Sequence, residues 1–384
     1  MRLALALALA IPVLAPLSGV SCAAAAKSSK DPLASGALRA TAVGRYDFES
    51  ADSRVDAPDP TADPTVAPEE LSGLVRIEGD RYLAIGDAHA TVHALTITVD
   101  PRTGAVRKAS FGAPILLRDI PGSRLPEPAM AEDREGIAYD PVKKEVLIAN
   151  EQTGADKRWP SIERYGMDGK TVAVLRVDSD PALAPFLHMR PNRGFESLTR
   201  SEDGSYWTAN EDALLVDGPA ASDTAGAEVR LLRLDADLHP GAQFVYPLDP
   251  WSRKIRNPSI VSGKEISGLS ELVALPGGRL LALERAFGGD IGGNASLRSR
   301  LYVVDLAGAT DVSTPEYRDG LAGKRYRPAR KTLLWEEGWG LTDSNFEGMA
   351  LGPELTDGSR LLLLIADNNG GSAQALFTLR LRKR

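Results

Sequence analysis

The sequence predicts an all-β fold, a β-propeller of five recognisable four-stranded blades, and three observations lead to it. First, a short phrase in which a small or acidic pair precedes an apolar residue occurs five times in the 384-residue chain. Second, the copies begin 63, 61, 74 and 77 residues apart, which is long for a solenoid turn but suits a propeller blade with loose outer loops. Third, too few strands follow the last copy to complete a blade, so an N-terminal strand should join it.

Each copy of the phrase is expected to form the innermost strand of one blade. The copies are Ser72-Gly73-Leu74, Glu135-Gly136-Ile137, Glu196-Ser197-Leu198, Ser270-Glu271-Leu272 and Glu347-Gly348-Met349. Because blades are arranged radially, the same position in every inner strand faces one central channel. We therefore expect Glu135, Glu196, Glu271 and Glu347 to converge in that channel.

The N-terminal residues 1–26 are expected to be a cleaved secretory signal peptide. One basic residue, Arg2, precedes an apolar run over residues 3–20, and small residues follow. Cleavage would remove Cys22, the only cysteine of the chain, so the mature protein should fold without a disulfide. A lipoprotein anchored through Cys22 is the less favoured alternative, since Gly19 stands where a lipobox usually has Leu. The mature chain is thus expected in the periplasm or outside the cell, with no transmembrane segment.

The remaining elements follow in chain order. Residues 27–37 are small and polar and should be flexible, whereas residues 38–384 should form a single propeller domain whose first strand covers residues 38–48. The first blade is expected at residues 74–77, 82–85, 93–99 and 114–117. The second is expected at residues 137–139, 146–149, 161–165 and 172–177.

The third blade should run over residues 197–246, with residues 230–234 as its third strand, and the fourth over residues 272–275, 280–283, 299–304 and 331–335. The fifth has only residues 348–351, 361–365 and 376–381. If residues 38–48 supply its outer strand, the ring closes and leaves no sheet edge exposed. A sixth, degenerate blade within residues 181–193 or 246–264 is the alternative.

Charge and motif content exclude several classes of function. The net charge of −7 disfavours nucleic acid as a partner, although it allows a local basic pocket. The chain contains no HExxH motif, P-loop or dinucleotide fingerprint. Residues 268–272 approach a nucleophile elbow but lack its final Gly. The sequence therefore lacks the motifs of serine hydrolases, zinc proteases and nucleotide-hydrolysing enzymes.

The candidate metal site is a ring of carboxylates. Hard oxygen ligands suit Ca²⁺, and several carboxylates in one narrow space need a cation, protons or basic partners. The expected ligands come from the inner strands and from the acidic residues that end the second strands. They are Glu196, Glu211, Glu271, Glu347 and Asp367. The structural alternative is that these residues tie blades together through backbone N–H groups or cap turns.

Three arginines lie beside the acidic phrases: Arg134, Arg193 and Arg285. The planar guanidinium group fits phosphate or carboxylate oxygens, so an arginine and a cation could hold a phosphate ester from both sides. Alternatively, each arginine pairs with the glutamate next to it. Asn150 and Asn210 end second strands and, with Arg285, are the candidates for substrate binding.

Four separated motifs resemble the phytase-like family of exported bacterial proteins, described as "esterase-like activity of phytase". They are DREGIAYDP at residues 133–141, NRGFESLTRSEDGSYWTANEDAL at 192–214, SELVALPGGRLLALER at 270–285, and NFEGMALGPEL at 345–355 with LLLLIADNN at 361–369. The similarity extends from about residue 36 to the C-terminus. It implies a propeller with calcium-assisted phosphomonoesterase activity. The chain lacks the dense lysine and aspartate cluster of proven propeller phytases, which disfavours phytate itself.

The function expected from these residues is a calcium-dependent phosphomonoesterase, acting on a small phosphate ester as a monomer. Glu135, Glu196, Arg134 and Arg193 are the candidate catalytic residues, with one inner glutamate as the base. Two alternatives remain: a calcium-dependent lactonase, as in gluconolactonase-type propellers, and a non-catalytic envelope propeller that binds a protein or glycan.

Overall fold

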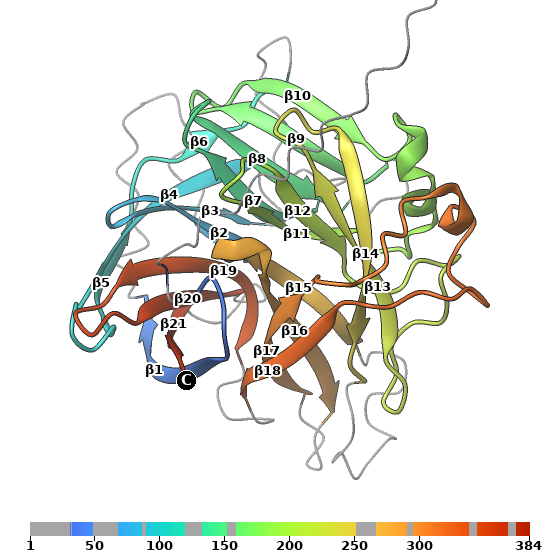
Figure 1. Cartoon of the computed structure of the whole chain (residues 1–384). Coiled ribbons are helices and arrows are strands. Elements are labelled where there is room, and N and C mark those ends of the chain that lie inside the picture. Colours follow the sequence, from blue (N-terminus) through green and yellow to red (C-terminus); the bar gives the residue numbers. More distant parts are fainter. Residues whose placement is uncertain are drawn as a thin grey trace, which may run out of the picture.

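The structure is a computed structural model that describes residues 31, 33–48, 68–86, 90–119, 133–151, 159–250, 266–289, 295–337, 344–367 and 374–384. Five antiparallel sheets surround one axis, which confirms the predicted five-bladed propeller (Figure 1). Among the described residues, no helix is long and apolar enough to cross a membrane.

The first two blades follow each other directly in the chain. Blade one contains β2 (Leu71–Glu78), β3 (Arg81–Gly86), β4 (Thr91–Val99), β5 (Val106–Phe111) and the short β6 (Ile115–Leu116). Blade two contains β7 (Arg134–Asp140), β8 (Glu145–Asn150), β9 (Ser161–Gly166) and β10 (Thr171–Arg176). In each blade the first strand is the innermost, as the repeat predicts.

The outer strand predicted for blade one was wrong. It was expected at residues 114–117, but β5 takes that place and pairs with β4 from Leu95↔Phe111 to Val99↔Val106. The nine-residue β4 is long enough to pair with β6 as well, at Thr91↔Leu116 and Val92↔Ile115. Residues 114–117 therefore contribute only a short addition at one end of the sheet.

Blades three and four are built in the same way. Blade three contains β11 (Phe195–Arg200), β12 (Tyr206–Asn210), β13 (Ala227–Leu234) and β14 (Pro240–Leu248). Blade four contains β15 (Ile266–Ala274), β16 (Leu280–Gly289), β17 (Ala295–Asp305) and β18 (Arg330–Glu336). The first candidate for a sixth blade contains the 3₁₀ helix η1 (Pro181–His188) instead of strands. The second begins within β14, and its residues 251–264 lie outside the described residues.

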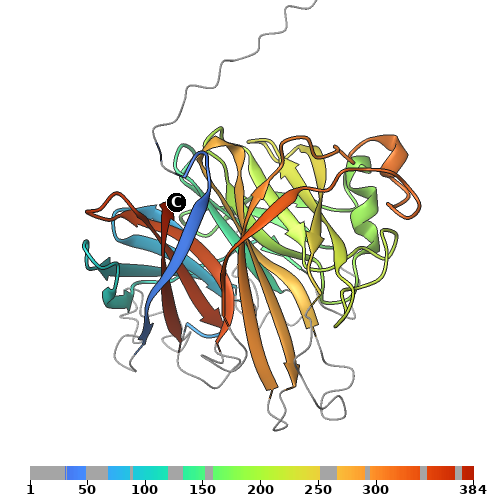
Figure 2. The same ribbon diagram turned by 60° about the horizontal axis from the view of Figure 1, so that its bottom comes forward.

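Blade five joins strands from both ends of the propeller. Its order is β1 (Leu38–Asp47), β21 (Ala375–Lys383), β20 (Arg360–Asp367) and β19 (Asn345–Glu354), with β1 outermost. β1 and β21 pair antiparallel from Leu38↔Lys383 to Asp47↔Ala375, which confirms the predicted closure (Figure 2). The expected flexibility of residues 27–37 does not extend to Leu33, which is buried beside blade four and accepts a hydrogen bond from Arg279.

The hydrophobic core lies between the blades, and β20 shows how the sequence produces it. Successive side chains of a strand point to opposite faces, so a strand between two blades needs apolar residues at every position. In β20 the buried Leu362 and Leu364 pack toward blade four, whereas Leu361 and Leu363 pack toward blade one. The unbroken apolar run of β20 thus serves two neighbouring cores.

Candidate functional site

A β-bulge occurs near the start of every inner strand, at the position where the repeated phrase begins. The strand register shifts around Ser72 in β2, Glu196 in β11, Ser270 in β15 and Glu347 in β19. In β7 the shift spans Glu135 and Gly136. A bulge bends its strand and redirects the side chain at that position. Three of the four predicted glutamates therefore lie at bulges, whereas Glu271 lies one residue beyond its bulge.

Two triads of carboxylates lie at the mouth of the channel where the inner strands begin. One contains Asp133, Glu135 and Glu151, the other Glu151, Glu196 and Glu211, and in each triad one oxygen per carboxylate lies within 4.8 Å of the others. We call these five side chains the acidic cluster. They come from blades two and three, and all of them except Asp133 are buried.

Two arginines contact the acidic cluster. The Nη2 atom of Arg285 is 3.1 Å from Oε1 of Glu211 and 3.4 Å from Oε1 of Glu196. Arg193 pairs with Oε2 of Glu211, so this carboxylate lies between two guanidinium groups. The Nη1 atom of Arg285 also pairs with Glu347. The predicted residues Glu196, Glu211, Glu347, Arg193 and Arg285 are thus brought together by three different blades.

The charges of this site are unbalanced among the described side chains. Burial raises the pKa of Glu196 and of Glu151 well above its ordinary value, and neighbouring carboxylates raise both further. Burial likewise raises the pKa of Asp133. Burial would lower the pKa of Arg285, but Glu211 and Glu196 raise it above its ordinary value. The pKa values of Glu196 and Glu151 are thus raised first by burial and second by repulsion between neighbouring carboxylates.

Glu347 and Asp367 are linked by a residue that was not predicted, Asn345. Its Nδ2 donates to Oε1 of Glu347 at 2.9 Å and to Oδ2 of Asp367 at 2.8 Å, while its Oδ1 accepts from Arg285 at 3.0 Å. Asp367 therefore joins the site through Asn345 and lies outside both triads.

Three predicted residues are fully buried and contact neighbouring strands. The side chain of Asn150 accepts from the backbone N–H of Asp133 and donates to Glu163, both at 3.2 Å. Asn210 accepts from the backbone N–H of Arg230 at 3.2 Å. Arg134 has no exposed surface and lies close enough to Tyr165 for its charge to act on that hydroxyl. These contacts stabilise the strands that carry the acidic cluster.

Asp133 and Glu151 were not among the predicted ligands. Glu151 follows Asn150 just as Glu211 follows Asn210, so the repeat itself carries the signal that would have found it. Asp133 has no counterpart in the repeated phrase. It stands one residue before β7, where its carbonyl accepts the backbone N–H of Glu151 at 2.7 Å, so the pairing of β7 with β8 brings it to the cluster.

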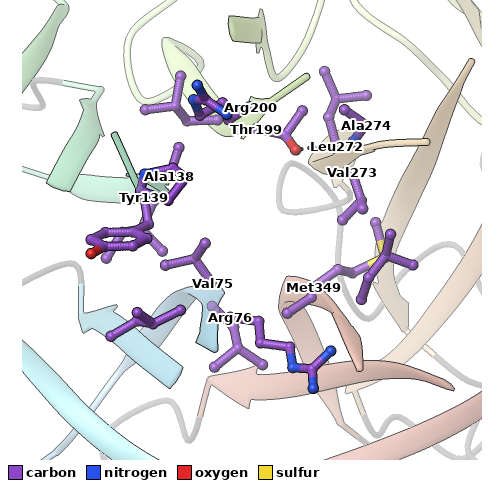
Figure 3. A pocket seen from close by; sticks show the side chains of 17 residues that line it. Val75, Arg76, Ala138, Tyr139, Thr199, Arg200, Leu272, Val273, Ala274 and Met349 are labelled. Carbon is purple, nitrogen blue, oxygen red and sulfur yellow. Dashed lines mark hydrogen bonds between the residues drawn. The ribbon is translucent and has the colours of Figure 1, made fainter. Parts of the chain in front are cut away.

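The opposite mouth of the channel is a different environment. It forms a pocket of 240 Å³ lined by the far ends of the inner strands, with Arg76, Tyr139 and Arg200 around the opening in Figure 3. One buried apolar side chain from each blade lines it: Leu74, Ile137, Leu198, Leu272 and Met349. None of the described lining residues is acidic. The acidic cluster is therefore confined to one face of the ring.

Comparison with known proteins gives one family match. The model of a family described as "Phytase-like: Esterase-like activity of phytase" matches residues 68–370, which is more than half of the chain. No curated protein matches the sequence.

Several solved structures are similar to this chain at low identity. A structure titled Dos1 propeller has 8% identity and a TM-score of 0.33, over 82% of this chain and 69% of that one. The soluble aldose sugar dehydrogenase of Escherichia coli has 10% identity and a TM-score of 0.36, over 91% and 100%. The GH43 endo-arabinanase of Bacillus licheniformis has 11% identity and a TM-score of 0.34, over 80% and 92%.

Proposed function

This chain belongs to the phytase-like family, and from that premise we propose that it is a calcium-dependent hydrolase of phosphate monoesters. The observation that carries the proposal is the position of Arg193 and Arg285 against a buried cluster of carboxylates. Carboxylates alone would repel a phosphate ester. Carboxylates that hold a cation beside two guanidinium groups would attract one.

The acidic cluster fits a hard cation. Its five side chains offer only carboxylate oxygens, and neither triad contains the His or Cys that softer metals prefer. Ca²⁺ takes six to eight oxygen ligands in irregular geometry, which five carboxylates with solvent could supply. Burial and the neighbouring carboxylates raise the pKa of Glu151 and Glu196, and a bound cation would offset both effects.

In the proposed mechanism a bound Ca²⁺ would neutralise charge on the phosphate group. Arg193 and Arg285 would orient the phosphate oxygens; their side chains are 18% and 14% exposed, in contrast to the fully buried Arg134. Glu135 or Glu196, the two candidate catalytic glutamates of the acidic cluster, would take the proton from the attacking water. Arg134 would act only through its neighbour Glu135.

Export of the mature protein belongs to the same proposal. A phosphate ester would be hydrolysed in the periplasm or outside the cell, where the predicted signal at residues 1–26 would direct the chain. That segment lies outside the described residues. Two alternatives use the same cluster, a lactonase and a binding propeller with a structural cation.

One assay separates the three functions. Purified protein is incubated with p-nitrophenyl phosphate, glycerol phosphate, phytate and simple lactones, with Ca²⁺ and after chelation. Hydrolysis of a phosphomonoester that is lost on chelation and restored by Ca²⁺ supports the proposal. Hydrolysis of lactones alone supports the lactonase, and no hydrolysis of any compound above the metal-free blank supports the binding propeller. Glu196→Gln serves as the inactive reference.

A further inference from the structure

Glu271 occupies a position where three of the other four inner strands have a glycine and β11 has Ser197. An added Cβ at Gly136 would lie 2.2 Å from the backbone N of Leu198, and one at Gly348 would lie 2.8 Å from the backbone N of Leu74. Neighbouring inner strands therefore touch backbone to backbone at this level of the channel. In β15 the same position carries a long acidic side chain, which must extend away from the strand that bears it.

The carboxylate of Glu271 connects three blades. It is 1% exposed, and its Oε1 accepts the backbone N–H of Leu272 at 2.9 Å and that of Leu198 at 3.3 Å. The backbone N–H of Met349 also lies close enough to this carboxylate to lower its pKa. One side chain thus holds backbone groups of β15, β11 and β19. Burial raises the pKa of Glu271 well above its ordinary value, and these backbone N–H groups offset part of that rise, so the side chain has donors without a metal.

The strands held in this way are those that carry the site. Leu198 lies two residues after Glu196, and Met349 lies two residues after Glu347. Both glutamates stand at bulges, where the ladder of backbone hydrogen bonds is interrupted. A contact with Glu271 immediately beyond each bulge would hold the strand in place where the ladder of backbone hydrogen bonds is interrupted.

We propose that Glu271 is a positioning residue, which pins β11 and β19 beyond their bulges and so keeps Glu196 and Glu347 beside Arg285. This role differs from the cation ligand expected from the sequence, and its consequence for Ca²⁺ rests on the proposed function. The two roles respond differently to substitution. Gln keeps an oxygen that can accept the N–H groups of Leu198 and Leu272, but it loses the charge that a cation ligand needs.

The first test is hydrogen–deuterium exchange on the full chain without Ca²⁺. Glu271→Leu should speed amide exchange at least ten-fold in residues 195–200 and 345–354, because their shared acceptor is lost. Glu271→Gln should stay within about three-fold of the parent. Asp305→Asn serves as the control, since Asp305 pairs with Arg330 on the exposed outer strands of blade four and its loss should change stability little. Unchanged exchange in Glu271→Leu, or an equal effect of Asp305→Asn in both ranges, overturns the proposal.

Glu271→Asp covers the case in which the leucine variant does not fold. Its side chain is one methylene shorter, so it keeps the charge but loses the reach to Leu198 N, already 3.3 Å away. Exchange in residues 195–200 should again rise at least ten-fold. Unchanged exchange in this variant would count against positioning.

The second test is calorimetric titration with Ca²⁺. Glu271→Gln should bind within about three-fold of the parent affinity, whereas Glu196→Gln should bind at least ten-fold more weakly. If both variants lose affinity equally, Glu271 is a ligand and the positioning role fails. A parent protein that binds no Ca²⁺ refutes the proposed function alone, because the exchange experiment decides the positioning role without the cation.

Discussion

Arg285 of blade four reaches Glu211 of blade three across the mouth of the channel, with Nη2 3.1 Å from Oε1. Arg193 takes the second oxygen of the same carboxylate. Glu211 therefore has a positive partner on each oxygen, whereas Glu151, which belongs to both triads, accepts the backbone N–H of Gly194. The site therefore has one side where Glu211 pairs with two arginines and another side where Glu151 lies among carboxylates.

Added Ca²⁺ should stabilise the protein. A ligand that binds only the folded state stabilises it by about 2.7 kcal/mol at a hundred times its dissociation constant. Differential scanning calorimetry should show a melting temperature that rises with Ca²⁺ concentration. Glu196→Gln should reduce this rise, and Asp217→Asn should leave it intact. No rise in the parent protein would count against a cation in the acidic cluster.

Arg193→Lys should lower turnover with little change in stability. Lysine keeps the charge beside Glu211 but cannot offer two parallel N–H groups to a phosphate, at a cost of roughly 1–3 kcal/mol in transition-state stabilisation. This corresponds to a fall of about 5- to 150-fold in kcat/KM. The measurement is steady-state kinetics on p-nitrophenyl phosphate beside a thermal melt. Unaltered kinetics would remove Arg193 from the phosphate site.

Asp217→Asn should destabilise the fold strongly. Asp217 and Arg230 have no exposed side-chain surface, and both oxygens of Asp217 accept from the guanidinium group at 2.7 Å. Loss of one partner of a buried ion pair costs about 3–5 kcal/mol. Urea unfolding should show this loss as a lower midpoint with an unchanged slope. A change of less than 1 kcal/mol would show that Arg230 is satisfied by Gln243 and the carbonyl of Tyr317.

Deletion of residues 27–48 should cause aggregation. The truncated chain lacks β1, so β21 becomes an unprotected edge with nine residues of exposed backbone groups. Light scattering and thermal melting would report the loss. Deletion of residues 27–30 alone is the matched control, because it keeps both β1 and Leu33. A longer truncation that melts like the parent would show that β1 contributes nothing to closure.

Asp140 should make stability depend on pH. Burial raises the pKa of Asp140, but the backbone N–H groups of Lys143 and Val142 and the hydroxyl of Tyr206 lower it below its ordinary value. Its contribution is therefore present above the unfolded-state pKa of about 3.9 and disappears as the pH falls through the lower folded-state value. Asp140→Asn should cost about 1–3 kcal/mol at pH 7 and much less at about pH 2. Equal costs at both pH values would refute this assignment.

The repeated phrase was sufficient to predict the blades because each copy combines a small or acidic start with an apolar residue, and an apolar strand follows it. Glu196 and Glu347 could be found because they occupy the same position in two copies. Glu271 could not be separated from them, since its shift by one residue matters only once the bulge at Ser270 is known. Register around a bulge depends on tertiary packing and not on the local pattern.

The outer strand of blade one shows a second limit. Residues 114–117 are more apolar than β5, whose sequence VRKASF carries two basic residues on a partly exposed outer edge. Burial patterns identify inner strands well, but an outer strand with one solvated side has a weaker signal. Asn345 was missed for another reason: it precedes the phrase, and two of its three contacts, with Asp367 and Arg285, join segments distant in sequence.

The pairing of β1 with β21 also sets the order in which this molecule can be completed. A ribosome makes β1 before every other strand of the propeller and β21 after all of them, so the two cannot meet until the propeller has been synthesised. The free-energy cost of joining such distant segments, which is entropic, grows only with the logarithm of their separation. It is about 3 kcal/mol larger than the cost of closing a ten-residue loop. The delay is therefore one of timing more than of free energy. Until β21 has been synthesised, β1 remains without the strand that it pairs with. A chain whose translation stops before β21 therefore cannot close the ring of blades.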